Sequence, residues 1–219
     1  MKNNGKVLPR TPWSANHLWE FSTKPFTVLL LSLVLFGIGE GLLVIAQLGS
    51  TPWTVLAQGI SASSGIHLGW TTFWISVAVL LAWIPLHQRP GLGTMMNILV
   101  IAATLGIFVQ YIQPVNSFWQ QLAACVAGVT IVGIASALYL TCHLGAGPRD
   151  GLMVGLCRAI GWRVGLVRTL IEGGVCLVGW LLGGAVGLGT LLFAFGVGWV
   201  VQAALQFLAR HYNTECHSE

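Results

Sequence analysis

The sequence predicts an all-α, polytopic membrane helix bundle: six transmembrane helices and two short Pro-led helices, arranged as two inverted three-span repeats. Three observations lead to this prediction. The 219 residues are 55% hydrophobic and only 7% charged, whereas a soluble domain carries about 25% charged residues. Six apolar runs approach the roughly 20 residues that a span requires. A pattern rich in glycine recurs at a constant offset of 96 residues.

The first predicted span follows a mostly polar segment, 1–24, which contains four basic residues. The apolar run after it is too long for a signal-peptide core and lacks a small-residue cleavage site, so we expect a retained transmembrane helix. In chain order, the six predicted spans are Pro25–Leu48, Leu68–Leu86, Gly93–Ile112, Trp119–Cys142, Val164–Leu182 and Gly189–Ala209.

Two shorter helices, Pro52–Ser64 and Pro148–Ile160, are predicted after the first and the fourth span. Each begins with proline, which suits the first turn of a helix. Each is too short to cross the bilayer comfortably. Re-entrant half-helices, interfacial helices and short spans all fit these segments, and the sequence leaves the three alternatives open.

The distribution of basic residues predicts the orientation of the spans. With six spans and the N-terminus inside, nine of the ten Lys and Arg residues fall in the inside regions 1–24, 87–92, 143–163 and 210–219. The outside regions 49–67, 113–118 and 183–188 contain none. This positive-inside pattern predicts that both termini are cytoplasmic. Because the basic residues form no stripe or basic helix, we expect the lipid bilayer, and no nucleic acid, as a partner.

An internal repeat relates residues 37–94 to residues 133–190, with 18 of 58 positions identical and no gap. The stretches "LGSTPWTVLAQG" (48–59) and "LGAGPRDGLMVG" (144–155) share Leu, Gly, Pro, Leu and Gly, and "GLGT" at 91–94 returns at 187–190. The repeats, 25–112 and 119–209, hold three spans each. Because three is odd, the second copy enters the membrane upside down, as in many secondary transporters with sites between the halves.

The six-span outline, the paired LG-x-x-P stretches and the repeated GLGT resemble the bacterial YczE/YyaS/YitT-like integral membrane proteins. The likeness covers roughly Pro25 to Ala209 and is closest at Gly37–Gly59 and Gly145–Gly155. It implies a multi-pass protein of the bacterial inner membrane. It supplies no activity and no catalytic residues to carry over to this chain.

Glu40 is the first candidate for a functional side chain, because an ionisable group near the centre of a span costs about 2.5–3.5 kcal/mol on insertion scales. It lies in "GIGEG", between Gly37 and Gly41, which let another helix approach closely. We therefore expect Glu40 to face the bundle. Two interpretations stay open: a carboxylate that couples a proton or cation or contacts a cationic substrate, and a protonated Glu that hydrogen-bonds a neighbouring helix.

Arg168 and Glu172 of the fifth predicted span are four residues apart and therefore share a helix face. Either they neutralise each other while Arg168 snorkels towards the cytoplasm, or Arg168 binds a substrate anion and Glu172 orients it. At the repeat offset, the uncharged Thr72 and Ser76 take their places, and Ser136 takes that of Glu40. The charges therefore break the repeat symmetry that the glycines keep.

The stretch "GPRDG" (147–151) adds Arg149 and Asp150 as candidates. The amides at a helix N-terminus favour anions; Arg149 would add charge attraction, and Asp150 would cap or cover the site. The plainer alternative is a capped cytoplasmic helix start, with Arg149 as a positive-inside residue. Asn97, within the third predicted span, is a weaker candidate, because interhelical hydrogen bonding is a sufficient reason for it.

The leading hypothesis is a small secondary transporter or channel with a site between the repeats for a small molecule or ion. The alternative is a non-transporting accessory or scaffold protein of the membrane. The sequence contains no nucleophile, metal or phosphate motif, so we expect no enzyme, catalytic residue, metal or cofactor. The small size of the chain is compatible with a homodimer. The predicted site residues are Glu40, Arg168, Glu172, Arg149, Asp150 and Asn97.

Overall fold

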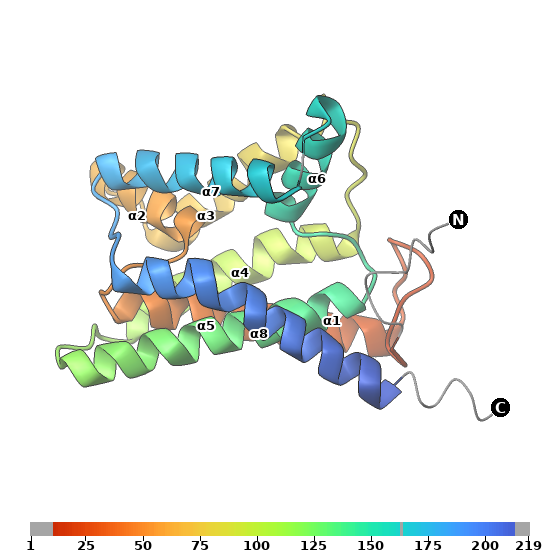
Figure 1. Cartoon of the computed structure of the whole chain (residues 1–219), viewed down its shortest axis with the longest axis horizontal. Helices are drawn as coiled ribbons and strands as arrows, with labels where there is room; N and C mark the ends of the chain where they lie inside the picture. Colours follow the sequence, from red (N-terminus) through yellow and green to blue (C-terminus); the bar gives the residue numbers. More distant parts are fainter. Residues whose placement is uncertain (1–10, 163, 213–219) are drawn as a thin grey trace.

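The computed structural model describes residues 11–162 and 164–212, except for the side chains of residues 158, 164–166 and 168. The described residues form helices and no strand, which confirms the all-α prediction (Figure 1). The helices are α1 (Thr23–Ile45), α2 (Pro52–Ser64), α3 (Leu68–Leu81), α4 (Leu92–Tyr111), α5 (Phe118–Thr141), α6 (Pro148–Ile160), α7 (Val164–Leu181) and α8 (Leu188–Tyr212).

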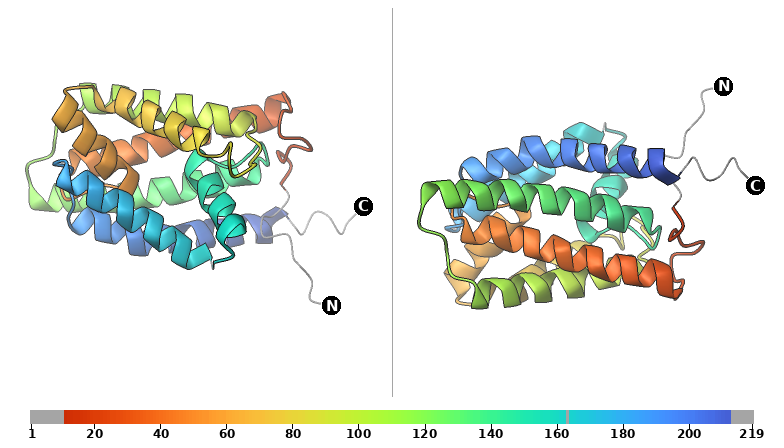
Figure 2. Two further views of the ribbon diagram at one scale, coloured as in Figure 1. Left: turned by 90° about the horizontal axis from the view of Figure 1, so that it is seen from above. Right: turned by 90° about the horizontal axis from the view of Figure 1, so that it is seen from below.

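The helices pack in two layers. One layer has α1 and α5 at its centre and α4 and α8 at its edges, in the order α4, α1, α5, α8 (Figure 2). The other layer has α2 packed on α7, with α3 and α6 beside them. Because α2 and α7 come from different halves of the sequence, as do α1 and α5, both layers join the two halves.

Four of the described helices are long and apolar enough to cross a membrane: α1, α4, α5 and α8. The helices α2 and α3 meet the same criterion only together, and the chain bends by 119° between them, as in a broken span or a re-entrant loop. In α7, the fully described apolar segment, Thr169–Leu181, is shorter than a full span. The helix lengths therefore support four or five spans, and the count of six spans stays a prediction.

Glycines on α1 let it approach both of its neighbours. A methyl group on Gly37 would lie 2.7 Å from Cβ of Thr104 on α4, and one on Gly39 would lie 2.8 Å from a methyl of Val132 on α5. Such close helix packing relies on small residues, because the apolar lipid gives little hydrophobic drive for association. The side chain of Glu40, next to Gly39, is fully buried, which confirms that it faces the bundle.

The two halves of the chain make reciprocal contacts in their connecting segments. The amide of Gly93 donates to the carbonyl of Leu144 at 2.8 Å, and the amide of Gly189, 96 residues further on, donates to the carbonyl of Leu48 at 2.7 Å. Gly49 and its counterpart Gly145 both have positive φ, +104° and +117°. The GLGT segment of each half is thus bound to the LG-x-x-P stretch of the other half.

Both ends of the described chain lie at the same end of the bundle (Figure 1). The ring of Trp13 packs edge-on against Tyr212 of α8, with centroids 5.0 Å apart. Trp13 also donates from its indole nitrogen to Thr141 at the end of α5, at 3.1 Å. These contacts bring the N-terminal segment and the C-terminal ends of α5 and α8 together.

Candidate functional site: a cavity between the two halves

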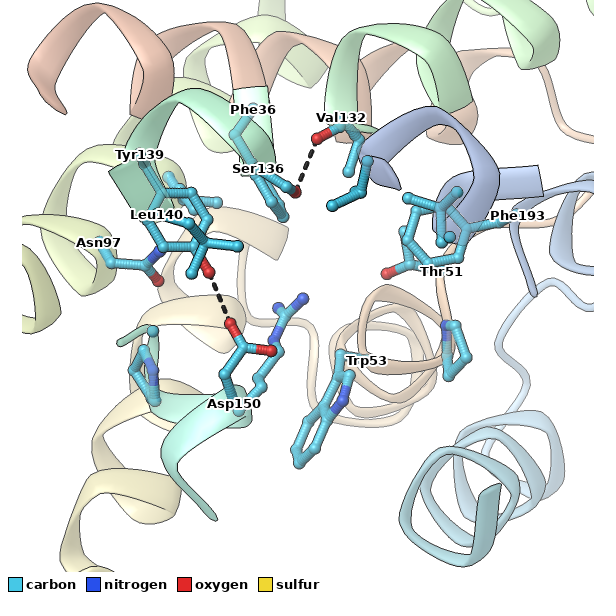
Figure 3. A pocket seen from close by; sticks show the side chains of 18 of the residues that line it. Phe36, Thr51, Trp53, Asn97, Val132, Ser136, Tyr139, Leu140, Asp150 and Phe193 are labelled. Carbon is cyan, nitrogen blue, oxygen red and sulfur yellow. Dashed lines mark hydrogen bonds between the residues drawn. The ribbon is translucent and has the colours of Figure 1, made fainter. Parts of the chain in front are cut away.

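A cavity of about 590 Å³ lies between the two layers, and all eight helices contribute to its lining (Figure 3). Its walls are mainly apolar, with a few polar and charged side chains, as is typical of small-molecule sites. Many lining residues form pairs 96 residues apart. Among these pairs are Pro52 and Pro148, Trp53 and Arg149, Ser76 and Glu172, Asn97 and Phe193, and Ile101 and Val197.

The cavity extends further along the second half than along the first. On α8 its lining runs from Phe193 to Ala209, near the end of the helix, whereas on α4 it stops at Ala102. Beyond that point α3 and α4 pack closely, since a methyl group on Gly69 would lie 2.8 Å from Cα of Gly106. The corresponding helices, α7 and α8, make far less contact in the described part of the chain. The cavity therefore extends towards the end that holds the termini.

Glu40 and Arg149 form an ion pair that joins the first half of the chain to the second. Nη1 of Arg149 donates to Oε1 of Glu40 at 3.0 Å, and the Glu40 side chain is fully buried while that of Arg149 is 23% exposed. Thr51 donates a longer hydrogen bond of 3.4 Å to the same carboxylate oxygen. The sequence interpretation treated Glu40 separately from Arg149, so this pairing was not foreseen.

The two short helices begin inside the bundle and present their N-terminal residues to the cavity. Trp53, at the start of α2, lies under the guanidinium of Arg149, with 5.5 Å between the guanidinium carbon and the ring centroid. The N-cap of α2 is Thr51, whose hydroxyl accepts from the amide of Thr54 at 3.2 Å. At α6 the N-cap is Gly147, which has no side chain with which to cap the first amides. The amide of Thr54 in α2 therefore has a side-chain acceptor in the N-cap residue, whereas the N-cap residue of α6 offers none.

Asp150 and Asn97 also reach the cavity from the second and first half, respectively. Asp150 accepts a hydrogen bond of 2.5 Å from the hydroxyl of Tyr139 on α5 (Figure 3). The Asp150 carboxylate therefore bonds α5 rather than capping its own helix. Asn97 lines the cavity from α4 (Figure 3).

Glu172 lines the cavity from α7, and it has an interaction partner. The side chain of Arg168 lies outside the described residues, so the predicted pairing of these two residues stays a prediction. Of the six predicted site residues, the structure thus places Arg149, Asp150, Asn97 and Glu172 in the lining, with Glu40 joined to it by the ion pair.

Three buried side-chain oxygens lack a hydrogen-bond partner in the described part of the protein: Oε2 of Glu40, Oγ of Ser50 and Oγ1 of Thr72. Of these residues, Thr72 lines the cavity. A buried polar atom without a partner is costly and calls for an explanation such as a functional role or a water. Among the described residues, no three His, Cys, Asp or Glu side chains are grouped so that they could hold a metal.

Sequence analysis missed Trp53 and Tyr139 as parts of the site. Both look like ordinary membrane aromatics in the sequence, where tryptophan and tyrosine are common at interfaces. One signal was present for Trp53: it occupies the position of Arg149 in the first repeat. No comparable signal singled out Tyr139, because its importance comes from the fold, which brings Asp150 to its hydroxyl.

Comparison with known proteins places the chain among membrane proteins. Residues 23–206 match a family described as a family of unknown function, DUF6198. An uncharacterized protein of Haemophilus influenzae is 50% identical over 210 residues, which cover 96% of each chain. In Bacillus subtilis, the uncharacterized membrane protein YczE is 26% identical and covers 82% of this chain and 85% of its own, and YyaS is 23% identical, with 83% and 92% covered. No solved structure matches the chain.

Proposed function

Since this chain belongs to the DUF6198 family of unknown function, we propose its activity from the cavity: it is a small secondary transporter of the bacterial inner membrane. Its substrate binds in the cavity between the halves, which carry out alternating access. The cavity carries this proposal, because its lining extends towards one end of the bundle while the corresponding helices at the other end are in contact. A transporter open to one side has this asymmetry.

The proposal includes six spans in two inverted repeats, with both termini in the cytoplasm. The reciprocal contacts of Gly93 and Gly189 support it, as does the positive-inside pattern. In this arrangement α2 and α6 are re-entrant half-helices that enter from opposite sides and whose N-termini meet near the midplane. Broken helices of this kind form substrate sites in several transporter folds. The homodimer stays a prediction.

Cysteine labelling tests the inverted arrangement at two repeat-related, exposed positions, Ser63 near the end of α2 and Ala159 near the end of α6. In a variant without native cysteines, we expect a membrane-impermeant maleimide to label Ser63→Cys from the periplasm and Ala159→Cys only from the cytoplasm. Labelling of both from the same side would refute the inverted repeats. A cysteine at exposed Arg89, in a predicted cytoplasmic loop, is the orientation control.

Blocking the cavity tests transport. Gly198 lines the cavity on α8, and a methyl group added to it would meet no atom within 4 Å from elsewhere in the described structure. We expect Gly198→Leu to fill part of the cavity and reduce flux in proteoliposomes by about tenfold or more without changing thermal stability, because it adds bulk without a clash. Flux is measured with a panel of cations, anions and zwitterions against empty liposomes.

The matched control is Gly174→Leu. Gly174 also has free space around an added methyl group, but it lies outside the cavity lining, so this variant should transport like the unmodified protein. If the unmodified protein produces no flux above empty liposomes with any member of the panel, the accessory or scaffold function is favoured over transport. If both leucine variants lose flux equally, the cavity is not the path.

A further inference from the structure

Arg149 brings unused donor capacity to the cavity, whose lining also includes the side-chain amides of Asn97, Gln202 and Gln206. Arg149 has five N–H donors, and the described contacts give it one hydrogen bond, to Glu40, beside its stacking on Trp53. Arg149 belongs to the first turn of α6, whose N-cap residue, Gly147, supplies no side-chain cap. Of the cavity carboxylates, Asp150 accepts from Tyr139 through Oδ2, and Glu172 has an interaction partner.

These donors suit an anion. A guanidinium binds a carboxylate or phosphate through two parallel hydrogen bonds, and a helix N-terminus favours negative charge. The hydroxyl of Thr72, which lines the cavity, is buried and has no partner in the described part of the chain, so it offers one more hydrogen bond to a ligand. Arg149 and the start of α6 therefore define where the head of a ligand would bind, and Thr72 is a further donor in the same cavity.

The mainly apolar part of the lining suits an apolar body. On α8 it includes Val197, Val201 and Leu205, with the amides of Gln202 and Gln206 among them, and α4 and α5 contribute Ile101 and Val132. An elongated apolar group along α8 would be removed from water against these side chains, at about 25 cal/mol per Å² of apolar surface. Head and body together describe an amphiphile rather than an inorganic ion.

A ligand anion on Arg149 would compete with Glu40. Arg149 is the charged group that faces Glu40 in the described structure. The hydroxyl of Thr51 approaches from α2, while α4 and α5 pack on the neighbouring glycines through uncharged Thr104 and Val132. If Arg149 turns to a ligand, Glu40 is left as a buried carboxylate without a counter-charge, a state that is costly unless it takes up a proton.

We propose that the cavity binds a small amphiphilic oxyanion, whose head displaces Glu40 from Arg149 at the N-terminus of α6, and that Glu40 takes up one proton from the buffered solution as it is displaced. The proton forms the carboxylic acid O–H of Glu40, and the negative charge lost there is replaced by that of the ligand. This inference deepens the proposed function and rests on it: anion and proton would move together.

Binding to the purified protein in lipid nanodiscs tests the ligand class. The probes share a phenylalkyl body of varied length and differ in the head: a carboxylate, its carboxamide, its amine and a phosphate monoester. We expect at least one anion, carboxylate or phosphate, to bind about tenfold or more tightly than the matched amide and amine. The head group of the tighter anion shows whether the natural ligand is a carboxylate or a phosphate. Equal or tighter binding of the amine, or no binding by any anion in the series, would overturn the proposal.

Proton uptake is measured by calorimetry of the best anion in two buffers with different ionisation enthalpies. We expect uptake of about one proton per ligand in the unmodified protein. Glu40→Gln should abolish this uptake and tighten anion binding, because the competitor for Arg149 is gone; a Glu40 with only a structural role would leave proton uptake unchanged. Arg149→Lys should weaken binding about tenfold, whereas Arg89→Lys, at an exposed loop position, should not.

These results separate the ligand class from transport itself. Anion binding with proton uptake but without flux would leave the site intact and overturn transport. Flux of a cation or a neutral solute through the cavity, without anion binding, would overturn the ligand class and leave transport intact. Because the probe series is tested on the unmodified protein, the comparison holds even where a variant fails to fold.

Discussion

Arg149→Ala is expected to destabilise the folded protein by about 3–5 kcal/mol, because removing Arg149 leaves the buried carboxylate of Glu40 either uncompensated or forced to take up a proton. The charge left behind is the carboxylate of Glu40, which is fully buried and accepts from Arg149 at 3.0 Å. In the described structure, the Glu40 carboxylate accepts one other hydrogen bond, a longer one of 3.4 Å from the hydroxyl of Thr51. Chemical unfolding in nanodiscs, followed by tryptophan fluorescence, measures the loss.

The pair is isolated by a double-mutant cycle. Replacing a buried ion pair by apolar residues of similar volume is often neutral, so Glu40→Met with Arg149→Met should recover most of the stability that either single variant loses. Arg89→Ala, at an exposed position, serves as the control and should change stability by less than about 0.5 kcal/mol. Additive losses in the double variant would show that the two side chains do not depend on each other.

Gly49→Ala is expected to have the second large effect, a loss of about 2–5 kcal/mol from left-handed strain and overpacking together. Gly49 has a φ of +104°, and a methyl group on it would lie 2.5 Å from the amide nitrogen of Gly187. Because that neighbour is backbone, it cannot move aside as a flexible side chain would. The variant should also disturb the bond between Gly189 and Leu48, which ties the two halves together.

Two further glycine variants separate the cost of the left-handed backbone from the cost of the clash between the halves. Gly145→Ala combines a φ of +117° with a tight contact, 3.0 Å from Oγ1 of Thr94, and should be intermediate. Gly65→Ala has a φ of +72° and open space around the methyl group, so it should cost only the conformational strain, about 1–2 kcal/mol. Equal losses for all three would mean that backbone conformation alone matters and that contact between the halves does not. Unfolding in nanodiscs is again the measurement.

Much of the fold could be predicted from the sequence because apolar runs and turn residues act locally. The offset of 96 residues predicted that the two short helices correspond, and the structure begins and ends them at Pro52–Ser64 and Pro148–Ile160, as expected. The predicted bounds of the spans agree less well with the structure: the span predicted to end at Leu86 ends at Leu81, as α3. Apolar residues continue after α3, so hydropathy alone could not show where the helix stops.

The sequence by itself determined that this is a helical membrane protein, that its glycines recur with one offset, and that Glu40 faces the bundle beside Gly37 and Gly41. Those conclusions depend on composition and on residues close together in the chain. Only the tertiary structure decided that Glu40 meets Arg149 and that Tyr139 meets Asp150. Glu40 and Arg149 are 109 residues apart, and their contact depends on the short helix α6, whose first residues line the cavity. No local pattern specifies such a contact, because it is set by the packing of whole helices.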